Sequence, residues 1–144
     1  MMNWRERLNT RIKNTIKLIN KEESKDMELN EYQEKAMQTC LDTCKNITYM
    51  LNGLNAEVGE VNDKIAKAIR KGWIYIDGNH LVETEECPEN FGMEVLKEVG
   101  DCLWFISGLS QVLSADLEFV AVMNLRKLSS RQQRGVIDGN GDNR

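Results

Sequence analysis

The chain has 144 residues, of which 41% are hydrophobic, 29% charged and 6% aromatic. This length fits one domain with an ordinary core, and the composition is typical of a globular protein, which excludes disordered and collagen-like chains. No apolar run approaches the roughly 18 residues of a membrane span, and no signal peptide opens the chain. We therefore expect a cytoplasmic protein with no membrane partner.

The net charge of −4 hides a strong division along the chain. Residues 1–25 carry seven basic and three acidic side chains, residues 124–144 carry five and two, and residues 26–123 carry seven and eighteen. Carboxylates repel a nucleic-acid backbone, so nucleic acid is not an expected partner. An acidic middle suits divalent cations and basic ends suit phosphates, although for any single residue a solvated helix face is the simpler interpretation.

Helical periods dominate the first half of the chain. Apolar residues at steps of four and three predict an amphipathic N-terminal helix, which with its polar linker covers residues 1–26. A second helix is predicted over residues 30–44. The clearest period covers residues 47–71 and stops at Gly72, a residue typical of the position just beyond a helix.

A hairpin and two more helices are predicted in the second half. The β-prone runs 73–76 and 79–82 flank Asp77-Gly78, a preferred hairpin turn. A fourth helix is expected over residues 90–113, and a fifth from an N-cap at Ser114 to residue 131. The fourth helix has a predicted buried stripe that consists of Leu96, Val99, Leu103 and Ile106.

Carboxylates occur in matched pairs on the third and fourth predicted helices. Glu57 and Glu60 are three residues apart, so they project from one face on adjacent turns, and each precedes an apolar residue of the stripe. Glu98 and Asp101 repeat this arrangement on the fourth helix. If the two helices pack along their apolar stripes, the four carboxylates meet at the edge of the seam.

Four carboxylates at a half-buried seam repel one another unless a cation lies between them. Oxygen ligands without histidine or cysteine select Mg²⁺, with Mn²⁺ as its substitute. A di-iron centre needs a Glu-x-x-His pair on two helices, and His80, the single histidine, falls in the predicted hairpin. Because E-x-x-E pairs are also common on charged helix surfaces, spacing alone leaves a metal site and an ordinary surface both open.

The fifth helix carries a possible complement to the carboxylates. Asn124, Lys127 and Arg131 share one face, and Arg134 follows one turn later if the helix continues. Cations with an amide suit a polyphosphate, and a solvated basic stripe is the alternative. In the hairpin, Trp73 is a candidate for stacking on a nucleobase, although hairpin aromatics more often pack on the core.

At these residues the chain resembles the MazG-like nucleotide pyrophosphohydrolases of the all-α NTP pyrophosphatase superfamily, in particular their short, phage-associated branch. The ordered E-x-x-E and E-x-x-D pairs are the most specific part of this resemblance, which covers about residues 28–144. The matching segments are Glu31-Tyr32-Gln33, residues 53–61, residues 97–101, residues 124–128, Arg131, Arg134-Gly135 and residues 139–144. The family commonly has two adjacent glutamates where this chain has Ala56-Glu57, and residues 1–23 lie outside the match.

The resemblance implies that Glu57, Glu60, Glu98 and Asp101 bind Mg²⁺ and act in hydrolysis of a nucleoside triphosphate to a monophosphate and pyrophosphate. It also implies a homodimer or homotetramer. The substrate-binding candidates are Asn124, Lys127, Arg131, Arg134 and Trp73.

The expected fold is therefore all-α, with a four-helix core, an N-terminal amphipathic helix and a small β-hairpin. The expected divisions are residues 1–26, a helical domain over residues 27–134 and a glycine-rich tail over residues 135–144. Two other functions stay open: a non-catalytic helical protein that binds metal for stability, and a related pyrophosphohydrolase that acts on a phosphoribosyl-nucleotide or an alarmone.

Overall fold

A computed structural model describes residues 6, 9–10, 12–14 and 27–139 of the chain. The described elements are α3 (Leu29–Met37), the 3₁₀ helix η1 (Asp42–Cys44), α4 (Ile47–Arg70), β1 (Ile74–Asp77), β2 (His80–Glu83), α5 (Phe91–Val112) and α6 (Leu117–Gln133). The all-α class with one small hairpin is confirmed. Most of the predicted N-terminal helix, and residues 140–144 of the predicted tail, lie outside the described residues.

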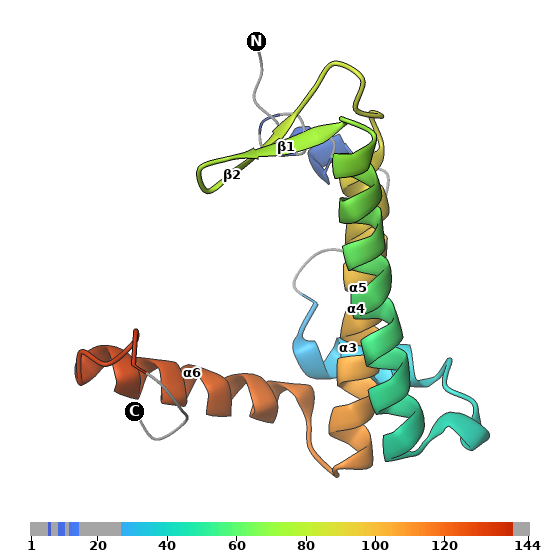
Figure 1. Ribbon diagram of the computed structural model, residues 1–144. Coiled ribbons are helices and arrows are strands. Elements are labelled where there is room, and N and C mark those ends of the chain that lie inside the picture. Colours follow the sequence, from blue (N-terminus) through green and yellow to red (C-terminus); the bar gives the residue numbers. More distant parts are fainter. Residues whose placement is uncertain (1–5, 7–8, 11, 15–26, 140–144) are drawn as a thin grey trace.

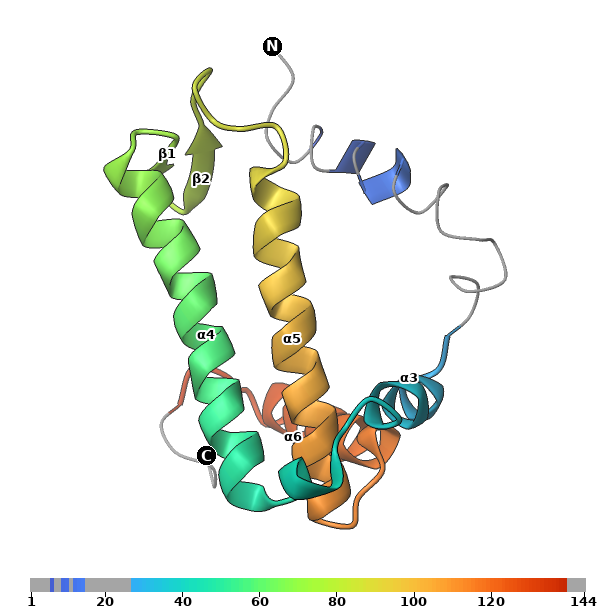
Figure 2. The same ribbon diagram turned by 90° about the vertical axis from the view of Figure 1, so that its right-hand side faces the viewer.

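The centre of the fold is the antiparallel pair α4 and α5, which lie side by side over most of their length (Figure 2). Glycines allow this close approach near one end. A Cβ atom at Gly53 would clash with the Phe105 ring, and one at Gly108 would clash with the Met50 thioether. Small residues opposite large ones therefore set the register of the pair.

Two separate apolar clusters close the ends of the α4–α5 seam. The first contains Met37, Cys40, Met50 and Phe105, and it joins α3 to the pair. The second contains Ala68, Ile74 and Phe91, and it joins the hairpin to the pair. The middle of the seam belongs to neither cluster, so polar side chains have room between the two helices there.

The hairpin is confirmed, with its turn one residue later than predicted. Asp77 pairs with His80, so Gly78 and Asn79 form the two-residue loop. Gly78 has a φ of +58°, the left-handed conformation that glycine adopts without strain. Glycine at the first central position is the preference of a type II′ turn, and this explains the shift from Asp77-Gly78.

The second predicted helix is shorter than expected. It ends at Met37, and the chain then passes through an extended Leu41 into η1. Trp104 of α5 fixes this exit from α3, because its indole N–H lies 3.1 Å from the Ala36 carbonyl and 2.9 Å from the Thr39 hydroxyl oxygen. Tertiary hydrogen bonding therefore stops a helix whose local sequence favours continuation.

The prediction that Ser114 caps α6 is wrong. Ser114 has a φ of +59° and ends α5 in a Schellman motif, in which the Ser114 and Ala115 N–H groups donate to the Gln111 and Ser110 carbonyls. Asp116 is the N-cap residue of α6. The four residues 113–116 thus separate α5 from α6, and the helices meet at 97°.

Buried Gln33 on α3 holds this corner in place. Its amide nitrogen donates to the Ser107 carbonyl at 3.1 Å and the Ala115 carbonyl at 3.3 Å, and its amide oxygen accepts the Leu117 N–H at 2.9 Å. A single side chain thereby satisfies polar backbone groups on both sides of the turn. Figure 1 shows the result: α6 leads away from the α4–α5 pair.

The predicted buried stripe of α5 is wrong for the single chain. Leu96, Val99, Leu103 and Ile106 are 37–47% exposed, and Val58 of α4 is 46% exposed. The cause is the seam itself, because its middle holds the polar faces of both helices and turns the apolar stripes outward. Most apolar side chains of α6 are also exposed, although Leu117 is buried.

Within the part of the chain that is described, no single helix meets the length and hydropathy that a membrane span requires. The bent pair α5–α6 meets them only when the two helices are counted together.

Candidate metal centre

Three carboxylates from two helices meet in the middle of the α4–α5 seam. Glu57 of α4 and Glu98 and Asp101 of α5 each place one oxygen within 4.8 Å of the others. Glu57 and Glu98 are half-buried and Asp101 is exposed, so the cluster opens to solvent on the Asp101 side. The predicted meeting of the two acidic pairs is therefore seen for three of the four residues.

Glu60 lies outside this group and is exposed. It is still close enough for its charge to act on Glu57, since it contributes to the shifted pKa of that carboxyl. Its role as a metal ligand stays a prediction, as do the roles of the other three carboxylates.

The cluster is electrostatically strained without a cation. Burial, followed by the charges of Asp101, Glu60 and Glu98, raises the pKa of the Glu57 carboxyl above its ordinary value of 4.5. Repulsion between close carboxylates is relieved when a cation binds or when one carboxyl takes up a proton. A divalent cation placed between these carboxylates would relieve the repulsion.

Lys64 is the cation nearest to these carboxylates among the described ion pairs. Its ammonium nitrogen lies 3.1 Å from Glu98 Oε1, and the two side chains are 29% and 14% exposed. The hydrogen bond to Glu98 raises the pKa of Lys64. Lys64 is a site residue that sequence reasoning missed, although its spacing of four from Glu60 and seven from Glu57 places it on the same helix face.

Two further neighbours of the cluster were also missed. After burial, the charge of Asp101 is the second cause that raises the pKa of the Tyr32 phenol, which places this α3 side chain near the open side of the cluster. Burial, then the Glu57 charge, raises the pKa of the Cys102 thiol. Tyr32 belongs to the Glu31-Tyr32-Gln33 segment, and this was the available signal. Cys102 gave none beyond its adjacency to Asp101.

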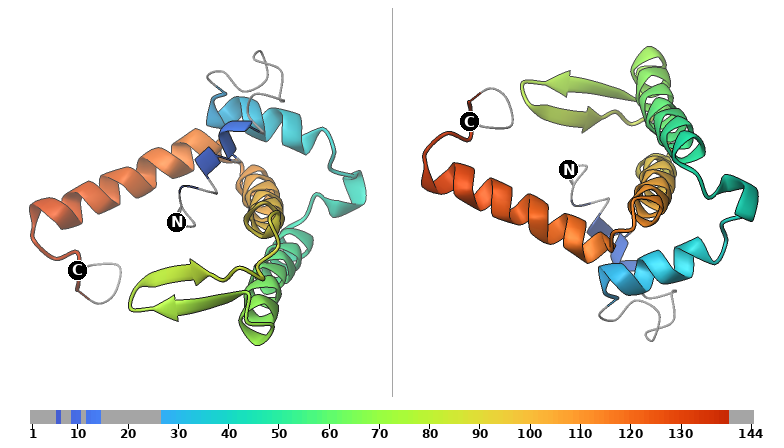
Figure 3. Two further views of the ribbon diagram at one scale, coloured as in Figure 1. Left: turned by 90° about the horizontal axis from the view of Figure 1, so that it is seen from above. Right: turned by 90° about the horizontal axis from the view of Figure 1, so that it is seen from below.

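The structure does not bring the predicted phosphate contacts of α6 to the cluster within one chain. Asn124, Lys127 and Arg134 are exposed, Arg131 is 6% exposed, and α6 ends at Gln133. Seen from above and from below, α6 extends away from the pair that carries the carboxylates (Figure 3). Their role in substrate binding stays a prediction.

Trp73 begins the hairpin and packs on the apolar cluster of Ala68, Ile74 and Phe91. The Lys71 ammonium lies over the Trp73 ring, 4.2 Å from its centroid. The ring is thus held between a cation and the core, and its contact with a base stays a prediction.

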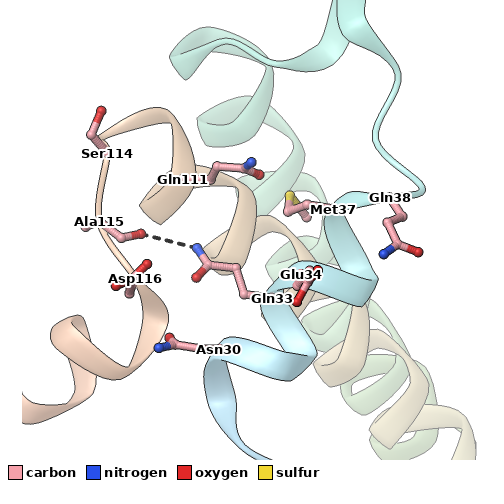
Figure 4. A pocket seen from close by; sticks show the side chains of 9 residues that line it. All are labelled: Asn30, Gln33, Glu34, Met37, Gln38, Gln111, Ser114, Ala115 and Asp116. Carbon is pink, nitrogen blue, oxygen red and sulfur yellow. Dashed lines mark hydrogen bonds between the residues drawn. The ribbon is translucent and has the colours of Figure 1, made fainter.

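A larger hollow, of about 570 Å³, lies between α3 and the α5–α6 corner (Figure 4). Its charged groups are Glu34 and Asp116, and the rest of its polar lining consists mainly of the amides of Asn30, Gln33, Gln38 and Gln111. Gln111 is ten residues from Asp101, about 15 Å along α5. We place the chemistry at the smaller carboxylate cluster because charge, rather than volume, selects a cation.

The donor set of the cluster fits a hard divalent cation. Glu57, Glu98 and Asp101 supply carboxylate oxygens and no nitrogen, which is the chemistry of Mg²⁺ and Mn²⁺ sites. The open side at Asp101 leaves space for water or a phosphate oxygen. The net charge of the three carboxylates also exceeds what Lys64 neutralises.

Two antiparallel helices that hold acidic pairs in a shared seam define an all-α protein with a carboxylate centre. The MazG nucleotide pyrophosphohydrolase domain family matches residues 45–136, and the chain belongs to this family. It is thus a pyrophosphatase-type hydrolase by family. Gene 37 protein of Mycobacterium phage L5 is 34% identical over 125 residues, which are 82% of this chain and 100% of that protein. No solved structure matches the chain.

Proposed function

We propose that the protein hydrolyses a nucleoside triphosphate, NTP or dNTP, to a nucleoside monophosphate and pyrophosphate with Mg²⁺ as cofactor. The observation that carries this proposal is the three-carboxylate cluster in the α4–α5 seam, within the segment that matches the pyrophosphohydrolase family. Glu57, Glu98 and Asp101, together with Glu60, are the proposed ligands. When bound, Mg²⁺ lowers the pKa of a water and neutralises charge on the triphosphate.

The protein side of the mechanism is positioning. The two apolar clusters fix the helix register at both ends, so the seam carboxylates are held facing one another before ligand arrives. The exposed edge at Asp101 admits the α-phosphate, whereas burial of Glu57 and Glu98 limits their solvation. A carboxylate of this set is the proposed general base for the attacking water.

We further propose that the protein acts as a homodimer or homotetramer. Supporting this, the stripes of α4 and α5 and the apolar side chains of α6 are exposed in one chain, for example Val99 at 47%, Phe119 at 57% and Leu125 at 64%. Exposed apolar surface of this extent is typical of an interface. In such an assembly Asn124, Lys127, Arg131 and Arg134 would contact the phosphates bound by a neighbouring copy.

The test is product analysis with a panel of canonical and modified NTPs and dNTPs in Mg²⁺, each with an EDTA control. We expect metal-dependent release of monophosphate and pyrophosphate. Orthophosphate with a diphosphate would refute the cleavage position. Absence of turnover together with thermal stabilisation by Mg²⁺ would instead favour a non-catalytic metal-binding protein, and phosphoribosyl-nucleotides and alarmones complete the panel as alternative substrates.

Two conservative variants test the ligand assignment. Glu60→Gln and Asp101→Asn remove one negative charge each with little change of volume, so we expect turnover to fall by at least about a hundredfold while the helical circular dichroism signal is retained. Glu83→Gln, at the end of β2, is the matched control and is expected to keep full activity. Full turnover in either seam variant would remove that residue from the metal centre.

A further inference from the structure

A second hollow adjoins the carboxylate cluster on the hairpin side. It has a volume of about 260 Å³, and its lining includes Lys64 and Lys67 of α4, Lys71 at the C-cap of α4, Trp73, and Phe91 and Glu94 of α5. We call this the lysine hollow. It shares Lys64 with the cluster, because Lys64 lines the hollow and also contacts Glu98. The lysine hollow and the proposed metal centre are therefore neighbours along one helix face.

Charge in the lysine hollow is unusual for this part of the chain. Residues 26–123 hold seven basic side chains against eighteen acidic ones, and four of those seven fall within residues 64–71. Three of the four line the hollow, against one acidic residue, Glu94, whose charge is already offset by Lys97 at 2.7 Å. Lysine residues therefore outnumber acidic residues in the lining of this hollow, which lies beside the negative cluster.

Of the three lysines, Lys64 pairs with the half-buried Glu98, whereas the ammonium groups of Lys67 and Lys71 have weaker partners. Lys67 pairs with Asp63 at 2.5 Å, and both side chains are more than half exposed. Lys71 rests over the Trp73 ring. Exposed ion pairs of this type contribute about 0.2–1 kcal/mol, so an arriving anion of higher charge displaces them readily. The walls that Trp73, Pro88 and Phe91 provide are apolar, which strengthens attraction between the ammonium groups and an anion.

Three lysines spaced at i, i+3 and i+7 rise about 10 Å along α4, starting at the edge of the carboxylate cluster. This row matches a linear polyanion better than a single phosphate, because it presents successive charges in one direction. A triphosphate with its α-phosphate at the carboxylates would extend its β- and γ-phosphates along such a row.

We propose that the lysine hollow binds the pyrophosphate portion of the substrate, and that Lys64 exchanges between Glu98 and this anion. The assignment of the anion as a leaving pyrophosphate rests on the proposed function. In the metal-free protein Lys64 neutralises Glu98, and it also opposes cation binding because it holds a positive charge 3.1 Å from a ligand oxygen. When an anion occupies the hollow, Lys64 turns to it and Glu98 is released for the cation. Lys64 is thus a positioning residue that couples anion binding to metal binding.

The test uses two probes in separate titrations: Mn²⁺ alone, and inorganic pyrophosphate alone in metal-free buffer, both followed by calorimetry. For Lys64→Met we expect Mn²⁺ to bind about two- to fivefold more tightly, since a competing cation is gone. We expect pyrophosphate to bind about tenfold more weakly in the same variant, since a charge-assisted contact is lost. A residue that only supports the fold would weaken both, so parallel losses would overturn the proposal.

Lys67→Met separates the two effects, because Lys67 pairs with Asp63 and, among the described ion pairs, has none with the cluster. We expect weaker pyrophosphate binding with unchanged Mn²⁺ affinity, and the same for Lys71→Met. Lys35→Met on α3 is the control of equal charge change, since Lys35 pairs with Glu31 of its own helix. If Lys67→Met and Lys71→Met bind pyrophosphate as tightly as Lys35→Met does, the hollow is not the anion site.

Tryptophan emission gives a readout that needs neither metal nor turnover. Because Lys71 lies over Trp73, its movement toward pyrophosphate should change the emission, and the change should disappear in Trp73→Phe. An unchanged emission at saturating pyrophosphate would contradict the engagement of Lys71. These measurements contain no nucleotide, so a failure of the hydrolysis assay leaves them standing. Conversely, intact hydrolysis with unaltered pyrophosphate binding in the lysine variants would overturn the lysine hollow alone.

Discussion

Asp101→Asn should stabilise the metal-free protein while removing its response to Mg²⁺. In the absence of a cation, one oxygen of Asp101 lies within 4.8 Å of one oxygen each of Glu57 and Glu98. Unit charges at that separation repel by about 0.9 kcal/mol in a medium like water and by about 3.5 kcal/mol at an effective dielectric constant of 20. Asp101 is exposed, so the lower value applies, and salt reduces it further.

Two such repulsions give a net gain of about 1–2 kcal/mol when the charge of Asp101 is removed at neutral pH. For a chain of this length, that corresponds to a rise in melting temperature of about 3–6 °C in EDTA. The expected sign is opposite with a saturating cation. Mg²⁺ binds the folded state and stabilises the wild-type protein by mass action, whereas the variant has lost a ligand.

The assay is a set of thermal melts of wild type and Asp101→Asn at pH 7, each in EDTA and in MgCl₂. We expect the order of melting temperatures to reverse: the variant is more stable than the wild-type protein in EDTA and less stable in Mg²⁺. Equal stabilisation of both proteins by Mg²⁺ would refute the carboxylate cluster as the cation site. A variant less stable than wild type in EDTA would refute the electrostatic reasoning.

The pH dependence of the same melts provides an internal check on the sign. Because the pKa of folded Glu57 lies above 4.5, folding favours its protonated form. The stabilisation from protonating Glu57 is complete below pH 4.5 and is lost as the pH rises through the raised pKa. Asp101→Asn removes the largest charge contribution to the raised pKa of Glu57. Without metal, the variant should therefore lose less stability than the wild-type protein as the pH rises through this range.

Three other predictions concern the packing and the tail. In chemical denaturation, Gly53→Ala should destabilise the protein by about 1–3 kcal/mol, because the new Cβ clashes with Phe105. Gly59→Ala is the control: its Cβ meets nothing within 4 Å, so it should be neutral or stabilise by up to about 1 kcal/mol. Gln33→Leu should lower the free energy of unfolding by about 3 kcal/mol, because it leaves buried polar backbone groups without hydrogen-bond partners. A loss under about 1 kcal/mol would contradict the role of Gln33 in holding the α5–α6 corner. Deletion of residues 135–144 should raise the KM for nucleotide, and an unchanged KM would exclude the tail from substrate binding.

Sequence periodicity predicted the long elements well for a physical reason. The α4 helix, the hairpin and α5 each have strong local patterns, and Gly72 ends α4 with a φ of +70°, as expected of a residue beyond a helix C-terminus. Where a predicted helix end was wrong, contacts with residues distant in sequence determine the observed end. Trp104 ends α3 through its hydrogen bonds to Ala36 and Thr39. These partners lie 68 and 65 residues away in sequence, so no local signal in residues 30–44 indicates the contact.

The seam was the least predictable feature, because its packing face does not look apolar. Residues that face α5 include Gly53, Glu57 and Lys64, which local hydropathy assigns to the surface. The apolar stripe that hydropathy assigns to the core is instead half exposed, as at Val58 and Val99. Periodicity identifies the apolar face of a helix, but it does not show whether that face packs inside one chain or against another chain.

The acidic pairs were nevertheless found, because their spacing rather than their burial carries the signal. Three-residue spacing puts Glu57 beside Glu60, and Glu98 beside Asp101, whichever face packs inward. The match of residues 45–136 to the pyrophosphohydrolase family includes both acidic pairs. Lys64 was missed because a lysine on an acidic helix is usually explained as a surface charge that balances its neighbours. Only the 3.1 Å contact with Glu98 shows that the Lys64 side chain reaches from α4 to α5.

The two apolar clusters hold α4 and α5 together on both sides of the charged part of the seam. Met50 and Phe105 pack at one end, Ala68 and Phe91 at the other, and the repelling carboxylates lie between them. A single continuous apolar seam would be more stable but would leave no place for a cation. Repulsion in the middle is opposed by burial at both ends, so the helices stay close enough for carboxylates of both to lie within reach of one proposed ion. Weakening either cluster should therefore lower cation affinity as well as stability.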